Sequence, residues 1–185
     1  MEIRSFISIN LPIALKTTID NTITELKAFG RDVKWIKGEA LHITMKFLGN
    51  INVERLALFE EVLTETSTMH SPFDLKFSGL GFFPNQRYPK IVWIAVNTSP
   101  ALNKLQAEID DKFEKLGFSK EKRKFSPHLT IGRIKDDANT RTLTEKVLSM
   151  GNTYFGTFTV NSFFLMKSDL QKDGAKYTVI KEFPL

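Results

Sequence analysis

The sequence predicts an α+β protein built from duplicated strand–helix–strand lobes that face each other across a central groove. Two observations lead to this prediction. The stretches Leu41–Phe47 and Pro127–Arg133 each alternate apolar and polar residues, and each contains a His-x-Thr triplet. Alternation with a period of two is typical of a strand with one buried face. In addition, strand, helix and strand signals come in the same order before each triplet.

The first half of the chain shows clear helix boundaries. Pro12 at a first turn and Gly30 after a last turn mark the ends of one helix, and Asn52 is an N-cap for a second. The expected segments are a strand at Ile3–Asn10, a helix over 12–30, a short apolar piece at Val33–Ile36, the His42 strand closed by Gly49-Asn50, a helix from Asn52 to about Thr66, and an extended segment at Phe73–Phe83.

The second half repeats this order. Ile91–Asn97 is apolar throughout, which predicts a strand buried on both faces, and Ser99-Pro100 caps a helix that ends at Gly117. The remaining expected segments are the His128 strand, a short helix over about 139–150, an extended segment at Phe155–Ser168, a hairpin turn at Gln171–Gly174 and an extended segment at Lys176–Phe183.

A repeat relates the two halves. Ile7–Asn10 matches Ile94–Asn97, and the two His-x-Thr triplets match at nearly the same spacing. We therefore predict one bilobal domain over 1–185, with pseudo-repeats at about 3–70 and 90–150 that can exchange terminal strands. Each wall of the groove between the lobes would then carry one imidazole and one hydroxyl.

Alternate residues of a strand share a side, and this assigns the faces of the first motif. Strict alternation sends its apolar residues to the core: Leu41, Ile43, Met45 and Phe47. The groove face then carries His42, Thr44 and Lys46. In the second motif strict alternation turns Arg133 away from the groove, whereas a kink or bulge at Gly132 would redirect it. Both outcomes stay open.

Composition limits the class of protein. The 185 residues contain no cysteine, which excludes disulfides and thiolate chemistry, and no apolar run is long enough to span a bilayer. A cytoplasmic monomer without membrane contact is expected. The net charge of +5 favours a polyanionic partner. The basic run Lys120–Lys124 before the second motif either attracts phosphate or is a solvated loop, and His70 is expected on a surface loop.

Two imidazoles on either side of one phosphate suit in-line displacement at phosphorus without a metal or other cofactor. A neutral histidine takes a proton from the attacking oxygen, and a protonated one supplies a proton to the leaving oxygen. Thr44 and Thr130 hydroxyls would donate to the non-bridging oxygens, with Lys46 and Arg133 as candidates for added positive charge. A strained 2′,3′-cyclic phosphate is the substrate that such a site favours.

The segments Leu41–Gly49 (LHITMKFLG) and Ser126–Arg133 (SPHLTIGR) resemble the two His-x-Thr motifs of the 2H phosphoesterases. Within them the chain most resembles the bacterial and archaeal RNA 2′,3′-cyclic phosphodiesterases, also called 2′-5′ RNA ligases. The resemblance implies two antiparallel sheets facing across the groove, with helices on the outside. It also implies hydrolysis of RNA or oligonucleotide 2′,3′-cyclic ends to 2′-phosphomonoesters, with 2′-5′ ligation as a reverse activity. By motif, His42 becomes the proton donor and His128 the proton acceptor.

Other functions remain open at this point. The substrate could be another small cyclic phosphate, such as ADP-ribose cyclic phosphate. The basic charge and the aromatic residues, among which Phe6 and Tyr154 could stack a nucleobase, also fit a non-catalytic RNA-binding protein. A metal-dependent phosphohydrolase is a third alternative, although no carboxylate stands at a recognisable ligand spacing from a histidine.

Overall fold

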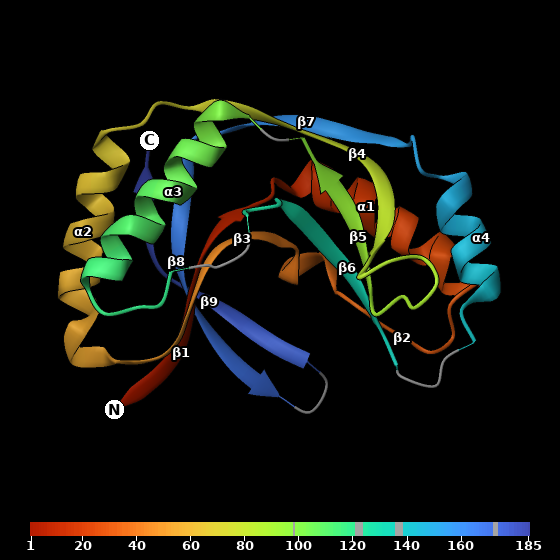
Figure 1. The fold of residues 1–185 in the computed structure, drawn as a ribbon, viewed down its shortest axis with the longest axis horizontal. Coiled ribbons are helices and arrows are strands. Elements are labelled where there is room, and N and C mark those ends of the chain that lie inside the picture. Colours follow the sequence, from red (N-terminus) through yellow and green to blue (C-terminus); the bar gives the residue numbers. More distant parts are fainter. Residues whose placement is uncertain (98, 121–123, 136–138, 172–173) are drawn as a thin grey trace.

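The computed structural model describes residues 1–97, 99–120, 124–135, 139–171 and 174–185. Within these ranges the chain forms two antiparallel sheets flanked by four α-helices (Figure 1), which confirms the predicted α+β fold. One sheet has the strand order β3-β1-β8-β9, and the other has the order β2-β6-β5-β4-β7.

The four-stranded sheet combines the N-terminal strand with the C-terminal hairpin. Its strands are β3 (His42–Asn52), β1 (Glu2–Asn10), β8 (Ser162–Gln171) and β9 (Gly174–Pro184). The five-stranded sheet consists of β2 (Val33–Trp35), β6 (His128–Ile134), β5 (Ile91–Val96), β4 (Phe73–Phe83) and β7 (Tyr154–Val160). The two predicted histidine strands, β3 and β6, therefore belong to different sheets.

The helix of each predicted strand–helix–strand unit packs on the sheet of the other half. Helix α1 (Ile13–Lys27) follows β1 but contacts β2, β7 and α4 (Arg141–Ser149). Helix α3 (Pro100–Lys115) follows β5 but contacts β3 and α2 (Leu56–Thr68). Figure 1 accordingly shows α2 and α3 on one side of the molecule and α1 and α4 on the other. The two sheets are thus held together by a chain that crosses between them.

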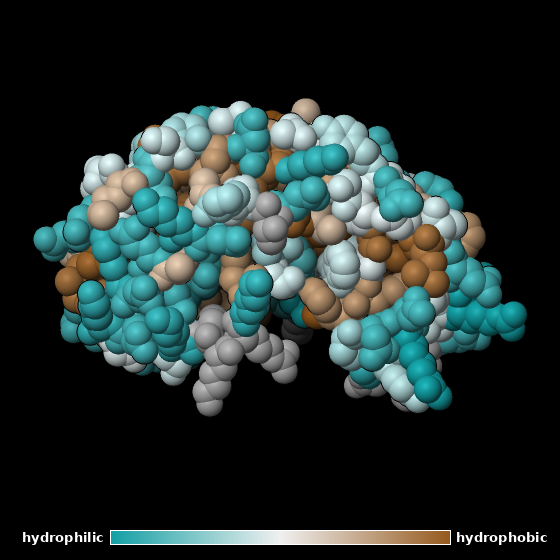
Figure 2. All heavy atoms as spheres, turned by 45° about the horizontal axis from the view of Figure 1, so that its top comes forward, coloured by the Kyte–Doolittle hydropathy of each residue, from teal (hydrophilic) through white to brown (hydrophobic). Residues whose placement is uncertain are grey.

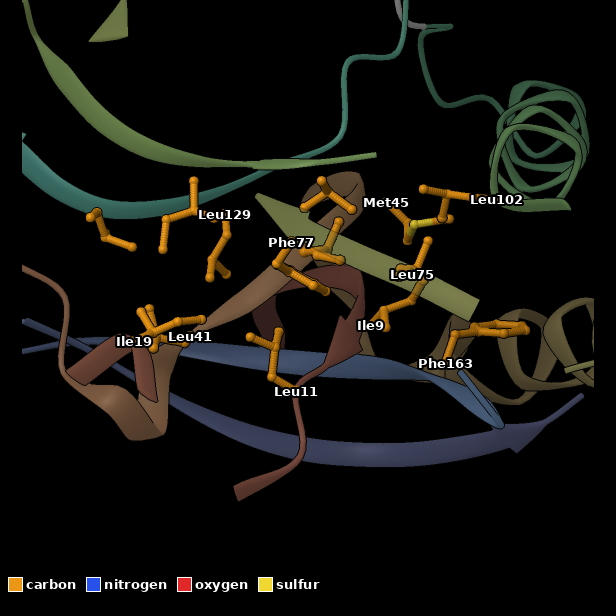
Figure 3. Close-up of a cluster of buried hydrophobic side chains, with 14 of the residues drawn as sticks. Ile9, Leu11, Ile19, Leu41, Met45, Leu75, Phe77, Leu102, Leu129 and Phe163 are labelled. Atoms are coloured by element: carbon orange, nitrogen blue, oxygen red, sulfur yellow. The ribbon is translucent and has the colours of Figure 1, made fainter. Parts of the chain in front are cut away.

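One continuous core supports both sheets. Side chains from β1, β3, β4, β6, α1 and α3 meet in it, and Figure 3 shows Met45 of β3 close to Leu102 of α3. Ile9, Leu75 and Leu129 are all fully or nearly fully buried in this cluster. No helix among the described residues is long and apolar enough to cross a membrane.

Several boundaries differ from those predicted. The segment Phe155–Ser168 is two strands in different sheets, because the chain leaves one sheet at Asn161 and enters the other. Strand β5 alternates between buried and half-buried residues, so it is not buried on both faces. Asn52 caps a 3₁₀ turn before α2, with its side chain accepting from the Glu54 amide. In the predicted turn at Gln171–Gly174, residues 172 and 173 lie outside the described residues.

Candidate active site

The first His-x-Thr strand contains a β-bulge directly after the triplet. The pairing of β3 with β1 skips Met45 between Thr44 and Lys46. One extra residue reverses the side on which every following residue points. Phe47 therefore joins His42 and Thr44 on one face of β3, where its side chain is 61% exposed. We call this the groove face of β3.

The second strand has the same bulge at the same distance from its histidine. The pairing of β6 with β5 skips Ile131 between Thr130 and Gly132. Arg133 is thereby turned onto the same face as His128 and Thr130, the groove face of β6, and it is exposed. The sequence left two positions open for Arg133, and in the structure the bulge turns Arg133 towards the groove. The shared bulge supports the predicted repeat.

Lys46 does not lie where strict alternation predicted it. Its side chain is 1% exposed and forms an ion pair with Asp110 of α3. Its Nζ also donates to the carbonyl oxygen of Ser119, at 3.0 Å. The expectation that Lys46 shares a face with His42 was wrong, as was the expectation that Phe47 points to the core. The bulge at Met45 turns Lys46 to the core side and Phe47 to the groove face.

Both histidine rings are held in the same way. Nδ1 of His42 lies 2.8 Å from the carbonyl oxygen of Ala40, and Nδ1 of His128 lies 2.8 Å from that of Ser126. A carbonyl oxygen only accepts, so each Nδ1 carries a hydrogen. In the neutral ring the lone pair is then on Nε2, which can accept a proton, and in the charged ring Nε2 can donate one.

Aromatic rings flank both histidines. The ring centroids of Phe6 and Tyr177 lie 4.8 and 5.0 Å from that of His42, and the Phe83 ring lies 4.9 Å from that of His128. These contacts fix the planes of the imidazoles. Sequence reasoning missed Tyr177 because it comes from β9, and no local pattern connects that strand with the histidine motifs.

The environment of His42 disfavours its charged form. Burial is the main cause that lowers the pKa of His42; the hydrogen bond to Ala40 opposes this, and the positive charges of Lys16 and Arg133 add to it. The charge of Arg133 lowers the pKa of His42 although the two residues come from different sheets. Since β3 and β6 are also in contact, the two groove faces converge. Figure 2 shows the surface hollowed between the side with α2 and α3 and the side with α4.

Two hydroxyls beside the histidines have no hydrogen-bond partner in the described part of the chain. Thr44 and Thr130 follow His42 and His128 by two residues on the same faces and are half-buried. Within the described ranges, no hydrogen bond engages either hydroxyl. Both are therefore able to donate to an oxygen atom placed between the two strands.

The other candidates from the sequence lie elsewhere. Tyr154 is 59% exposed on β7, beside Lys76, and neither residue is on a histidine strand. His70 lies in a loop as predicted, but its side chain is only 4% exposed and contacts Glu108 at 3.0 Å, so its expected surface position was wrong. In the basic run at 120–124, residues 121–123 lie outside the described residues, and Lys120 pairs with acidic side chains of α3.

Neither a metal-binding cluster nor a cavity beside α1 offers an alternative to this site among the described residues. Among the described residues, no group of three or more histidine or acidic side chains is arranged to hold a metal ion. A cavity of about 430 Å³ lies between α1 and the 3₁₀ turn Gly38–Ala40, with Asp20, Trp35 and Glu39 in its lining. Neither His42 nor His128 lines it. The groove faces of β3 and β6 therefore form the candidate active site.

Comparisons with known proteins identify the relatives of this chain. The chain matches the 2′-5′ RNA ligase superfamily over residues 15–172. It is 34% identical to a protein of Methanothermobacter thermautotrophicus named RNA 2′,3′-cyclic phosphodiesterase, over 100% of both chains. A protein of Methanocaldococcus jannaschii with the same name is 36% identical, over 97% of this chain and 99% of the relative.

Solved structures show the same fold. The crystal structure of the protein TT0787 of Thermus thermophilus superimposes with a TM-score of 0.85 at 25% identity, covering 99% of this chain and 98% of the other. E. coli LigT, crystallised with 3′-AMP, gives a TM-score of 0.77 at 22% identity and covers 100% and 99% of the two chains. The resemblance inferred from the paired motifs is thus confirmed over nearly the whole length, and the chain belongs to the 2′-5′ RNA ligase superfamily of 2H phosphoesterases.

Proposed function

We propose that this chain hydrolyses the 2′,3′-cyclic phosphate at an RNA 3′ end to a 2′-phosphomonoester by two-histidine acid–base catalysis. The observation that carries the proposal is the matched pair of imidazoles, each with Nδ1 bound to a backbone carbonyl and Nε2 left for chemistry. The names of the relatives, RNA 2′,3′-cyclic phosphodiesterase, support the substrate and the class of enzyme. The proposed site residues are His42, His128, Thr44, Thr130 and Arg133.

In the proposed reaction Nε2 of neutral His128 takes a proton from water while the water oxygen attacks phosphorus. The bond from phosphorus to the ribose O3′ breaks, and Nε2 of the His42 imidazolium donates a proton to that oxygen. The product is a 2′-phosphomonoester with a free 3′-hydroxyl. The assignment of donor and acceptor follows the family resemblance. The more open position of His128, compared with His42 between Phe6 and Tyr177, supports it because water must reach the base.

The lowered pKa of His42 bears directly on its role as proton donor. Burial and two nearby cations keep the ring neutral in the free protein more than an ordinary histidine. A phosphate anion bound between the strands supplies an opposite charge next to the ring, which raises the pKa again. His42 therefore becomes a competent acid chiefly when substrate is present.

The remaining groups would stabilise charge on the phosphate. Thr44 and Thr130 each offer a hydroxyl to a non-bridging oxygen, one from each strand, and Arg133 adds a guanidinium. Lys46 is not part of this set because its ammonium is buried against Asp110. Ligation to a 2′-5′ linkage would use the same groups, with a 5′-hydroxyl in place of water as the attacking group.

The test is incubation with an RNA that ends in a 2′,3′-cyclic phosphate, followed by assignment of the product. We expect a 2′-phosphomonoester, and a drop in kcat of about 100-fold or more in His42→Gln and in His128→Gln. The matched control is His70→Gln, which changes the third histidine, outside the groove, and should keep full activity.

Four outcomes would contradict the proposal or redirect it. Full activity in either groove variant would refute two-histidine catalysis, and a 3′-phosphomonoester would refute the order of bond breaking. Loss of activity in EDTA would favour the metal-dependent alternative. Turnover of ADP-ribose cyclic phosphate but not of the RNA end would keep the chemistry and change the substrate.

A further inference from the structure

Two cations lie side by side on the groove face of the five-stranded sheet. In the pairing of β2 with β6, Lys34 is directly opposite Arg133. A side chain added to Gly132 would meet Val33 Cγ1 at 2.7 Å and Trp35 Cε3 at 2.9 Å. Val33 and Trp35 thus point to the core side, and Lys34, between them, points with Arg133 to the groove side.

This arrangement is unfavourable in the protein alone. Like charges directly opposite on adjacent strands destabilise a sheet. Both side chains are exposed, and within the described ranges neither Lys34 nor Arg133 has an ion-pair or hydrogen-bond partner. In the same ranges other lysines, such as Lys112 and Lys146, are paired with carboxylates. An unpaired like-charge pair at the edge of a candidate active site indicates a place for an anion.

The pair lies beyond the reacting groups along the same strand. Arg133 is three residues past Thr130 on β6, at most about 10 Å along the strand, and Lys34 is on the next strand outward. The cyclic phosphate is the last group of its RNA, so any further phosphate of the substrate is on the 5′ side of the terminal ribose. An anion one strand away from Arg133 is then a backbone phosphate of that RNA.

We infer that Lys34, beside Arg133, binds the phosphodiester on the 5′ side of the terminal ribose, so that oligonucleotide ends are preferred over cyclic mononucleotides. This inference rests on the proposed function and adds to it a residue that determines the preferred length of the substrate. Lys34 acts in substrate binding, away from the reacting atoms. Its contribution is electrostatic and therefore decreases with salt.

The experiment compares a dinucleotide, ApA with a 2′,3′-cyclic phosphate end, with adenosine 2′,3′-cyclic phosphate. The variant Lys34→Gln removes the charge and keeps most of the side-chain length. We expect kcat/KM for the dinucleotide to fall about fivefold, as for an exposed charge-assisted contact, and kcat/KM for the mononucleotide to stay unchanged. The slope of log kcat/KM against log salt should decrease by about 0.7 for the dinucleotide. Lys104→Gln, on the exposed side of α3, is the matched control.

A neutral methylphosphonate in place of the internal phosphodiester tests the contact from the substrate side. The native protein should lose the same fivefold on this dinucleotide, whereas Lys34→Gln should lose nothing further. Equal losses of Lys34→Gln on the dinucleotide and the mononucleotide, or no loss on either, would overturn the inference while the proposed function stands. Absence of hydrolysis of both substrates by the native protein would overturn the proposed function and this inference with it.

Discussion

The buried ion pair between Lys46 and Asp110 should decide whether this fold is stable. Lys46 lies one residue after the bulge of β3, and Asp110 lies on α3, which comes from the other half of the predicted repeat. Lys46 also donates to the Ser119 carbonyl, in the connection that leads towards His128. The variant Lys46→Met removes the ammonium and keeps the volume, so the ion pair with Lys46 is lost while the Asp110 carboxylate stays buried.

The expected cost is large because both partners are desolvated. The side chains are 1% and 7% exposed, so water cannot take the place of the lost cation. Removing one partner of a buried pair costs about 3–5 kcal/mol. In a chain of this size each kcal/mol shifts the midpoint by about 2–4 °C, so the melting temperature should fall by roughly 6–20 °C. The double variant Lys46→Met/Asp110→Leu should recover most of this, because an apolar pair needs no compensating charge.

Thermal and urea unfolding of the native protein, the single variant and the double variant measure the loss of stability. Lys120→Met is the control. Lys120 forms an ion pair with Asp111, the neighbour of Asp110 on α3, but the side chains of Lys120 and Asp111 are both about half exposed. An exposed pair contributes little, so the control should unfold close to the native protein. The reasoning fails if Lys46→Met unfolds no earlier than the control, or if the double variant is as unstable as the single one.

Two further predictions follow from the surroundings of the histidines. The pKa of His42 is lowered from its ordinary 6.5, so its neutral form contributes stability fully above about pH 6.5, and this contribution is lost as the pH falls towards the folded pKa. Urea titrations across that range should show the loss of stability, and His42→Gln should remove this pH dependence. An unchanged pH dependence in the variant would contradict the prediction. Gly81→Ala should lower the free energy of unfolding by about 1–3 kcal/mol, because the added carbon would lie 2.6 Å from Cη2 of Trp93. Trp93 packs on Phe83, which lies beside His128. Urea unfolding followed by tryptophan fluorescence measures the change, and an unchanged free energy of unfolding would refute the prediction.

Sequence patterns located the strands and the paired triplets but not the faces beyond them. Up to Thr44 and Thr130 the period of two held, since Ile43 and Leu129 are buried. It failed after each triplet because a bulge is set by pairing with the neighbouring strand, which a single strand does not encode. A signal was nevertheless present in the repeat. Gly132 suggested a bulge, and aligning Lys46 with Gly132 would have placed Phe47 at the position of Arg133.

Contacts between distant segments were beyond local reasoning. The break at Asn161 separates two strands of different sheets, yet the sequence on both sides reads as one extended segment. Tyr177 reaches His42 only because β9 closes the four-stranded sheet. Likewise, Lys34 becomes a groove residue only because the short strand β2 joins β6 of the opposite half. Each of these depends on which strands become neighbours, a property of the whole fold.

The two bulges place different side chains at equivalent positions, and this difference gives the groove a direction. On the strand of His42 the position holds Phe47, whereas on the strand of His128 it holds Arg133, with Lys34 beside it. A nucleoside offers an aromatic face and an RNA backbone offers negative charge. Only one orientation puts the base against the aromatic wall and the backbone against the cationic wall. We therefore expect an RNA end to bind in this one orientation, with its base towards Phe47 and its backbone towards Arg133 and Lys34.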